Sequence, residues 1–260
     1  MNNILLKAEA IYLHPNGELY EYAENDFLNI LPETVYAAES FAKKKDYEKA
    51  AQAFIYVGYI WGETGNKESA MTAFKNAEKY GMLSGDSITT ARAQYNIAKL
   101  LYYECDYDAA RYMSDLADSN YGNNYDEKTY VNNLIANSYI VNKEYDNAEY
   151  YLKKSLNYAE AAQSVRAKSM AMNNYSIYYR EQGKYNEAID ILHNCLETDS
   201  TPTRVLMFNL NIGIIYMYMN QYDSAFNYIN KSLELSKLTR TKPETETSIY
   251  YYLSYITSVH

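Results

Sequence analysis

The chain has 260 residues, of which 48% are hydrophobic, so it can bury a sizeable core, and this excludes disorder as the state of the whole chain. Its net charge of −9 repels both a phosphate backbone and an anionic membrane surface, so we expect this segment to contact no nucleic acid and to insert into no membrane. Only 9 residues are Gly and 4 are Pro, whereas 33 are Tyr. The scarcity of turn-forming residues favours long helices joined by short connections.

The first 46 residues predict diverged helices that belong to the same single domain as the rest of the chain. Residues 4–31 are typical of a helical hairpin broken at Pro15-Asn16-Gly17, and residues 32–46 of a helix with Pro32 at its start. The opening apolar stretch is interrupted by Lys7 and Glu9, so it does not resemble a secretory leader. We expect a soluble segment, either cytoplasmic or periplasmic, that could also be part of a membrane-anchored protein.

From residue 51 onward the sequence repeats itself. The phrase Tyr-x-x-Ala ends at Ala110, Ala148, Ala188 and Ala225, which are 38, 40 and 37 residues apart, and a copy without the tyrosine ends at Ala70. Such a fixed period is the signature of a solenoid built from one repeated supersecondary unit.

Three columns of side chains accompany each of these alanines. Twelve residues upstream is a small residue: Gly58, Ala98, Ala136, Ser176 and Gly213. Seven residues downstream is another: Ala77, Ala117, Ser155, Cys195 and Ser232. Three residues after the first small position is a bulky one: Trp61, Leu101, Tyr139, Tyr179 and Tyr216. Small residues allow two helices to approach closely, so each copy is predicted to be a helix, a short turn and a second helix.

This spacing resembles the tetratricopeptide repeat family. The copy at 51–84 matches the family pattern at Phe54, Val57, Gly58, Trp61, Ala70, Phe74 and Ala77. The copies at about 91–124, 129–162, 169–202 and 206–239 match less fully, because their first aromatic position holds Gln94, Asn132, Met172 and Asn209. Residues 247–260 resemble the first helix of an incomplete sixth repeat, with Ser254 in the small position, and we expect the natural polypeptide to continue. The resemblance implies an all-α, right-handed superhelical solenoid of antiparallel helix pairs.

In this family the first helices line a concave groove, and the resemblance therefore implies which side chains face a ligand. The aromatic and basic candidates are Tyr59, Tyr95, Lys99, Tyr102 and Arg180, and the amide candidates are Asn96, Asn174 and Asn211, with Asn133, Asn137 and Asn173 close by. An amide can donate to a peptide carbonyl and accept from a peptide N–H at once. Two alternatives stay open: burial of the tyrosines between helices, and a groove wetted only by solvent. The full basic set of the chaperone-tail clamp is absent.

The sequence offers no pattern for catalysis, a cofactor or a metal. "GETGNKES" at 62–69 has the wrong spacing for a phosphate loop, and His14, His193 and His260 lack ligand partners in the sequence. Cys195 occupies a small core position, and Cys105 replaces a turn glycine. We therefore expect no enzyme activity and no cofactor.

The predicted function is a non-catalytic scaffold that binds a protein or a peptide. The opening "LLKAEAIYLHP", followed by tyrosine-rich repeats of about forty residues, also resembles the tetratricopeptide region of bacterial regulatory and signalling proteins, notably those of Bacteroidota. That resemblance implies the sensor region of a larger regulator. Two alternatives remain: a carbohydrate or small-molecule receptor that uses a tyrosine-rich groove, and a self-association module.

Overall fold

The computed structural model describes residues 24–239 and 243–259, which form helices joined by short connections and contain no strand. The helices are α2 (Glu24–Lys43), α3 (Tyr47–Glu63), α4 (Lys67–Ser84), α5 (Ser87–Tyr103), α6 (Tyr107–Asn120), α7 (Tyr125–Val141), α8 (Tyr145–Ala161), α9 (Val165–Glu181), α10 (Tyr185–Thr198), α11 (Pro202–Tyr218), α12 (Tyr222–Thr239) and α13 (Pro243–Val259).

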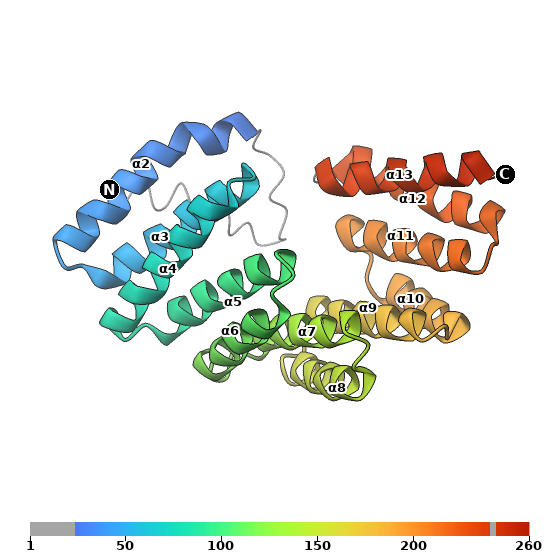
Figure 1. Ribbon diagram of the computed structural model, residues 1–260, viewed down its shortest axis with the longest axis horizontal. Coiled ribbons are helices and arrows are strands. Elements are labelled where there is room, and N and C mark those ends of the chain that lie inside the picture. Colours follow the sequence, from blue (N-terminus) through green and yellow to red (C-terminus); the bar gives the residue numbers. More distant parts are fainter. Residues whose placement is uncertain (1–23, 240–242, 260) are drawn as a thin grey trace. The chain divides into compact units, whose positions relative to one another are not determined.

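The helices fall into two compact units, residues 1–138 and 139–260, which we call unit 1 and unit 2. In unit 1, α3 packs on α4 and α5 on α6, and α2 and α4 contact the following helix in the chain. In unit 2, α9 packs on α10 and α11 on α12, with α8 against α9 and α13 against α12. Within each unit the chain thus runs back and forth in antiparallel pairs (Figure 1).

Residues at the turns explain where the helices begin and end. Tyrosine is the first residue of α6, α8, α10 and α12, so the tyrosine of each Tyr-x-x-Ala phrase begins a second helix. Asn66 and Asp106 cap α4 and α6, because their side chains accept hydrogen bonds from the backbone N–H groups of Ser69 and Ala109. The short turns within the pairs each contain one residue with a positive φ: Gly65, Cys105, Lys143, Gly183 and Asn220.

Cys105 is one of the non-glycine residues in this conformation, with φ of 63°. A left-handed backbone costs an ordinary residue about 1–2 kcal/mol because its Cβ approaches the following carbonyl oxygen. We expect Cys105→Gly to raise the free energy of unfolding by about 1 kcal/mol, measured by urea denaturation. Cys105→Ala, which also removes the thiol but keeps a Cβ, is the control. An equal gain in both variants would show that the thiol, and not the backbone, limits stability.

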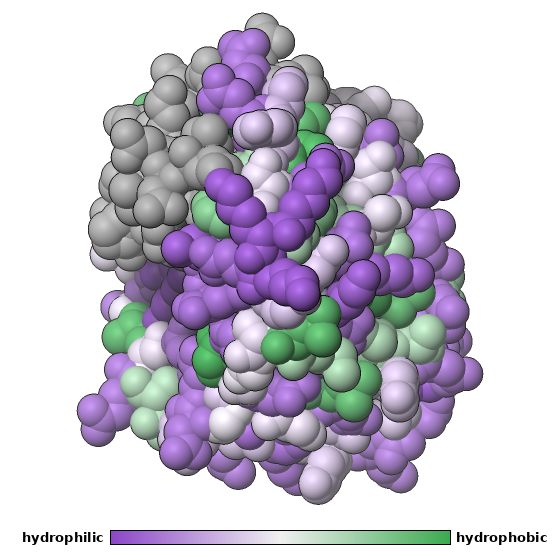
Figure 2. Space-filling model, turned by 90° about the vertical axis from the view of Figure 1, so that its left-hand side faces the viewer, coloured by the Kyte–Doolittle hydropathy of each residue, from purple (hydrophilic) through white to green (hydrophobic). Residues whose placement is uncertain are grey.

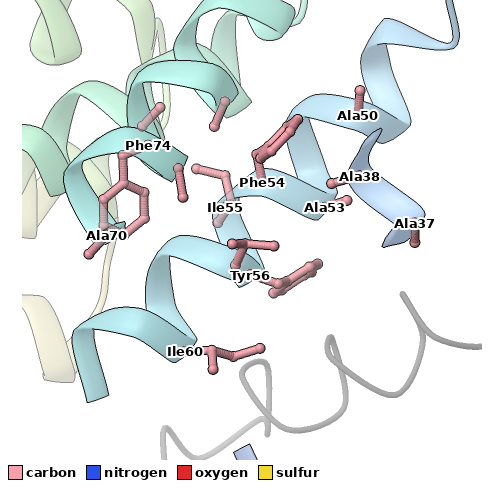
Figure 3. Packing of buried hydrophobic residues seen from close by; sticks show 14 of the residues in the cluster. Ala37, Ala38, Ala50, Ala53, Phe54, Ile55, Tyr56, Ile60, Ala70 and Phe74 are labelled. Atoms are coloured by element: carbon pink, nitrogen blue, oxygen red, sulfur yellow. The ribbon is translucent and has the colours of Figure 1, made fainter. Parts of the chain in front are cut away.

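The core of unit 1 forms where α3 lies between α2 and α4 (Figure 3). Phe54 and Ile55 of α3 are buried next to Phe74 of α4, and Ala37 and Ala38 of α2 are wholly inaccessible. The Phe54 ring stacks on Tyr80 of α4 with ring centroids 5.6 Å apart. In the repeat formed by α3 and α4, a stacked aromatic pair thus joins the two helices.

The two small columns of the sequence are buried, as the repeat spacing predicted. Every member of both columns belongs to a core position between helices. In unit 2 the surrounding core comprises Leu192 of α10 and Phe208, Ile212 and Ile215 of α11. Close helix approach, and not chemistry, accounts for these columns.

Two polar residues at the first aromatic position, Gln94 and Asn132, have partners on the preceding second helix. Gln94 of α5 is 4% exposed, donates to Glu78 of α4 at 3.0 Å and accepts from Asn120 of α6 at 2.9 Å. Asn132 of α7 donates to Asp118 of α6 at 2.7 Å. Paired amides and carboxylates thus occupy the aromatic position in these two copies, where they satisfy each other's hydrogen bonds.

One prediction for the N-terminal region is wrong. Pro32 was expected to begin a helix, but α2 begins at Glu24 and contains Pro32 within it. Proline lacks an N–H donor, so it removes one hydrogen bond without necessarily ending a helix when neighbouring residues pack well. Ala37, Ala38 and Phe41, all beyond Pro32, are buried in the unit 1 core and hold the helix in place. The predicted turn at Pro15-Asn16-Gly17 lies outside the described residues.

The surface is predominantly hydrophilic on the face that Figure 2 shows, where hydrophobic residues form separate patches among polar ones. Small, separate hydrophobic patches of this kind are typical of a solvent-exposed protein surface. Within residues 24–239 and 243–259, every helix falls short of the length and apolarity that a bilayer crossing requires.

Candidate binding face on the first helices of the pairs

The predicted ligand-facing residues lie on α3, α5, α7, α9 and α11, the first helices of the pairs, which we call the A-helices together with α13. Tyr59, Tyr95, Asn96, Lys99, Tyr102, Asn133 and Asn137 belong to unit 1. Asn173, Asn174, Arg180 and Asn211 belong to unit 2. The structure therefore describes two separate groups of candidate residues, each within its own unit.

In unit 1 an amide joins two neighbouring A-helices. Asn96 of α5 is 3% exposed, and its Nδ2 donates to the Arg92 carbonyl at 2.8 Å and to the Tyr59 hydroxyl of α3 at 3.3 Å. Burial raises the pKa of the Tyr59 hydroxyl, so it stays protonated. We call Asn96, Asn174 and Asn211 the asparagine column. Its first member thus makes hydrogen bonds inside the protein.

The remaining aromatic candidates of unit 1 differ in accessibility. Tyr95 is half-buried, burial raises its pKa, and the Lys99 ammonium lies 5.4 Å from its ring centroid. Tyr102 is half-buried and makes edge-to-face contacts with Tyr103 and Tyr107. Tyr103 is 67% exposed. Packing within the unit therefore accounts for the candidate rings, whereas the neighbouring Tyr103 presents its ring to solvent.

Asn133 and Asn137 lie one turn apart on α7, so they share a face of that helix. Asn133 is buried and Asn137 is half-buried. Asn137 is therefore the more accessible of the two.

In unit 2 the asparagine column again connects A-helices. Asn211 of α11 donates from Nδ2 to the Oδ1 of Asn173 of α9 at 2.7 Å. Asn174 is 6% exposed, and its Nδ2 donates to the Met170 carbonyl within α9 at 2.9 Å. Asn211 is half-buried, so of the three column members it has the most accessible amide.

Arg180 lies nearly two turns beyond Asn174 on α9, and its side chain reaches Tyr218 of α11. Its guanidinium carbon is 5.9 Å from the centroid of the Tyr218 ring, and its Nε and Nη2 donate to Glu181 at 3.0 and 2.9 Å. The Tyr218 ring also stacks on Tyr185 at 6.1 Å. The turn tyrosine of one pair thus supports an exposed ring on the next A-helix.

A hollow beside Tyr218 was not anticipated from the sequence. It has a volume of about 210 Å³ and is lined by Ile214, Met217 and Tyr218 of α11 and by Tyr251, Tyr252 and Tyr255 of α13. We call it the Tyr hollow. Because Asn211, Ile214 and Tyr218 recur at intervals of three and four residues, the hollow continues the helix face that carries Asn211. The sequence contains a tyrosine cluster at 250–255, and the packing of α13 on the rest of unit 2 places three of its rings in the hollow.

Other chemistry-bearing side chains lie apart from these faces. Cys195 is 2% exposed, and burial followed by the negative charge of Asp199 raises the pKa of its thiol to about 11, so it remains protonated. The His193 ring packs edge-to-face on Tyr228 at 6.1 Å. Across residues 24–239 and 243–259, His, Cys, Asp and Glu side chains form no group of three suited to a metal ion.

Family models for the tetratricopeptide repeat match residues 127–199 and residues 208–237. These segments contain the Tyr-x-x-Ala phrases ending at Ala148, Ala188 and Ala225, so the resemblance seen in the sequence is confirmed there. No curated protein sequence matches the chain.

Solved structures with the same fold share little sequence with this chain. The crystal structure of BtubC (BKLC) from P. vanneervenii has a TM-score of 0.65 at 13% identity and covers 85% of this chain and 93% of its own. Aspartyl phosphate phosphatase F from Bacillus subtilis has a TM-score of 0.64 at 16% identity, covering 98% and 80%. A kinesin light chain with nearly identical TPR-like repeats from Podosopora anserina has a TM-score of 0.52 at 11% identity, covering 73% and 97%. These likenesses confirm the predicted fold class, an all-α solenoid of helix pairs.

Proposed function

We propose that the chain is a non-catalytic scaffold whose A-helices bind a segment of another protein, since tetratricopeptide repeat models match residues 127–199 and 208–237. Tetratricopeptide repeats generally mediate binding of proteins or peptides. The observation that carries the proposal is the continuous face of unit 2 on which Asn211, Arg180 and Tyr218 lie next to an open hollow. Amide, guanidinium and phenol groups on rigid helices suit recognition of a peptide.

The asparagine column supports this proposal in two ways: Asn211 has amide groups available to a ligand, and a hydrogen bond holds its side chain in one orientation. Asn211 uses one N–H for Asn173, which leaves a second N–H and the carbonyl oxygen of a half-buried amide for a ligand. The hydrogen bond also fixes the rotamer of the Asn211 side chain. A fixed amide binds more tightly, since less conformational entropy is lost when the ligand arrives.

We also propose a narrower role, as the input region of a larger bacterial regulatory protein. The support is the resemblance of the opening segment and the tyrosine-rich repeats to such regions. Sequencing the parent gene on both sides tests it. A reading frame that encodes an effector or DNA-binding part agrees with the role, and a gene that encodes only repeats contradicts it.

Replacing Asn174 and Asn211 together by alanine is expected to weaken partner binding tenfold or more, because each hydrogen bond contributes about 1 kcal/mol net. The dissociation constant is measured by biolayer interferometry, with the chain immobilised and the partner in solution. Helix content, followed by circular dichroism, should stay the same.

Asn209→Ala is the matched control for this double variant. Asn209 is 5% exposed and donates to the Val205 carbonyl at 2.8 Å, which is the bond that Asn174 makes on α9. It lies two positions from Asn211 and therefore points to another side of α11. The control should bind as the original chain does. An equal loss in both variants would show that the A-helix face does not contact the partner.

A further inference from the structure

The Tyr hollow in unit 2 has the size and the shape of a site for one side chain. Its volume is about 210 Å³. An apolar cavity of about 150 Å³ accommodates benzene, so the hollow has room for a phenyl or indole ring. It opens to solvent, since Tyr218, Tyr251 and Tyr255 are 56%, 65% and 44% exposed.

The lining combines aliphatic and phenolic groups. Ile214 and Met217 of α11 are half-buried, and the rings of Tyr218, Tyr251 and Tyr255 stand around them. An aromatic ring gains from methyl and sulfur contacts below and from ring contacts at the side. Tyrosines also lose little conformational entropy on binding, because each has only two side-chain torsions.

The electrostatic environment favours a negative charge next to that ring. None of the residues that line the hollow is charged, and the Arg180 guanidinium lies 5.9 Å from the Tyr218 ring. Burial raises the pKa of Tyr252, and the positive charge of Arg180 opposes this rise, so Arg180 acts on two walls of the hollow. The acidic excess of the chain falls almost wholly in unit 1, which leaves unit 2 close to neutral.

Arg180 is already paired with Glu181, but this pair does not block a ligand. Both donors of Arg180 reach the same oxygen of Glu181, whose side chain is 38% exposed. The Arg180 side chain is only 17% exposed, but water reaches the Glu181 carboxylate and screens the pair. A ligand carboxylate that meets the planar guanidinium with two parallel hydrogen bonds gains more than this pair loses.

We propose that the Tyr hollow binds an aromatic or long aliphatic side chain from an acidic segment of a partner protein, with a neighbouring carboxylate of that segment paired to Arg180. The inference rests on the proposed function of the A-helices. It names the partner's chemistry at one end of the unit 2 face: an apolar side chain flanked by glutamate or aspartate.

Methyl NMR on the full chain tests the proposal with three probes. The first is acetyl-glutamyl-phenylalanyl-glutamyl amide. The second replaces both glutamyl units by glutaminyl, and the third replaces phenylalanyl by alanyl. The first peptide should shift the Ile214 and Met217 methyl signals in a saturable way, with a dissociation constant at least fivefold lower than those of the other two. No saturable shift, or equal binding of the neutral peptide, would overturn the proposal.

Variants separate the two parts of the site. Arg180→Gln should bind the acidic and neutral peptides equally, and Tyr251→Ala with Tyr255→Ala should weaken the acidic peptide at least fivefold. Tyr250→Ala is the matched control, since Tyr250 lies on α13, is 53% exposed and does not line the hollow.

Methyl glucoside serves as a fourth probe, which tests whether the hollow binds a sugar. If it saturates the same methyl signals more tightly than the acidic peptide, the hollow is a sugar site and the proposal fails.

The outcome is distinguishable from failure of the proposed function. If Asn174→Ala with Asn211→Ala weakens the captured partner and the Tyr251/Tyr255 variant does not, the scaffold function stands and the inference about the hollow is wrong. If neither variant changes the affinity, the proposal that the A-helices bind the partner is wrong.

Discussion

Gly213→Ala is expected to lower the free energy of unfolding by about 2 kcal/mol, since overpacking of a close helix contact costs about 1–3 kcal/mol. A Cβ at this position would lie 2.4 Å from Ile229 Cγ1 and 3.2 Å from the Ala225 carbonyl oxygen of α12. The side chain of Ile229 is wholly buried, so it has little room to move. Urea denaturation followed by circular dichroism measures the change.

Gly62→Ala is the control for this substitution. Gly62 lies within α3, and a Cβ there would meet no atom within 4 Å. Alanine should therefore stabilise the chain by about 0.5–1 kcal/mol through its higher helix propensity. A Gly213 variant that gains stability as the Gly62 variant does would contradict the account of the small column as a close-approach position.

Asp199→Asn is expected to lower the free energy of unfolding by about 2 kcal/mol at neutral pH. Asp199 is 3% exposed and lies between α10 and α11, where it accepts hydrogen bonds from Arg204 Nη2 and from the Thr201 backbone N–H, both at 3.0 Å. Arg204 Nε also donates to Asp199. Asparagine keeps the shape but removes the charge that these donors stabilise. Asp190→Asn, at an exposed carboxylate of α10, should change stability by less than about 0.5 kcal/mol.

The same carboxylate predicts an acid dependence. Burial alone would raise the pKa of Asp199, but the hydrogen bonds from Arg204 and Thr201 outweigh it and lower the pKa from 3.8 to about 2. Because the folded pKa lies below the unfolded one, this contribution is present above about pH 4 and is lost as the pH falls toward 2. The difference in unfolding free energy between the original chain and Asp199→Asn should therefore shrink over that interval. A constant difference would assign the loss to packing.

The sequence was most informative where one physical requirement recurs. Small residues at three fixed offsets allow close helix packing in every copy, so their column predicted the helix pairs and the burial of Gly58 and Gly213. The tyrosine of each Tyr-x-x-Ala phrase is the first residue of a second helix. It directly follows a short turn in which one residue, such as Cys105, has the positive φ that glycine usually adopts. Because the pattern occurs in five copies, a departure in one copy does not change the predicted fold.

Features that depend on a particular pair of side chains were less predictable. Pro32 was read as a helix start, but α2 begins earlier, at Glu24, and continues through Pro32 to the buried residues beyond it. The asparagine column suggested ligand contacts, whereas the structure adds hydrogen bonds between neighbouring A-helices, from Asn96 to Tyr59 and from Asn211 to Asn173. An amide can serve either purpose, and only the distance to its neighbour distinguishes them.

The Tyr hollow could not be derived from spacing alone. Its walls come from α11 and α13, which are separated along the chain by the whole of α12. Residues 247–260 were predicted only to form the first helix of an incomplete repeat, and the side of that helix that faces α11 follows from how the two helices pack.

The most direct test of the central claim, that the A-helices carry the binding face, is site-specific photo-crosslinking. Benzoylphenylalanine is introduced in place of Tyr218 or Tyr251 on the A-helices of unit 2, and in place of Tyr150 on α8 as a control of similar exposure: these residues are 56%, 65% and 63% exposed. The account predicts a discrete protein adduct from positions 218 and 251 in extracts of the source cells, and none from position 150. Adducts from position 150 alone, or equally from all three, would contradict it.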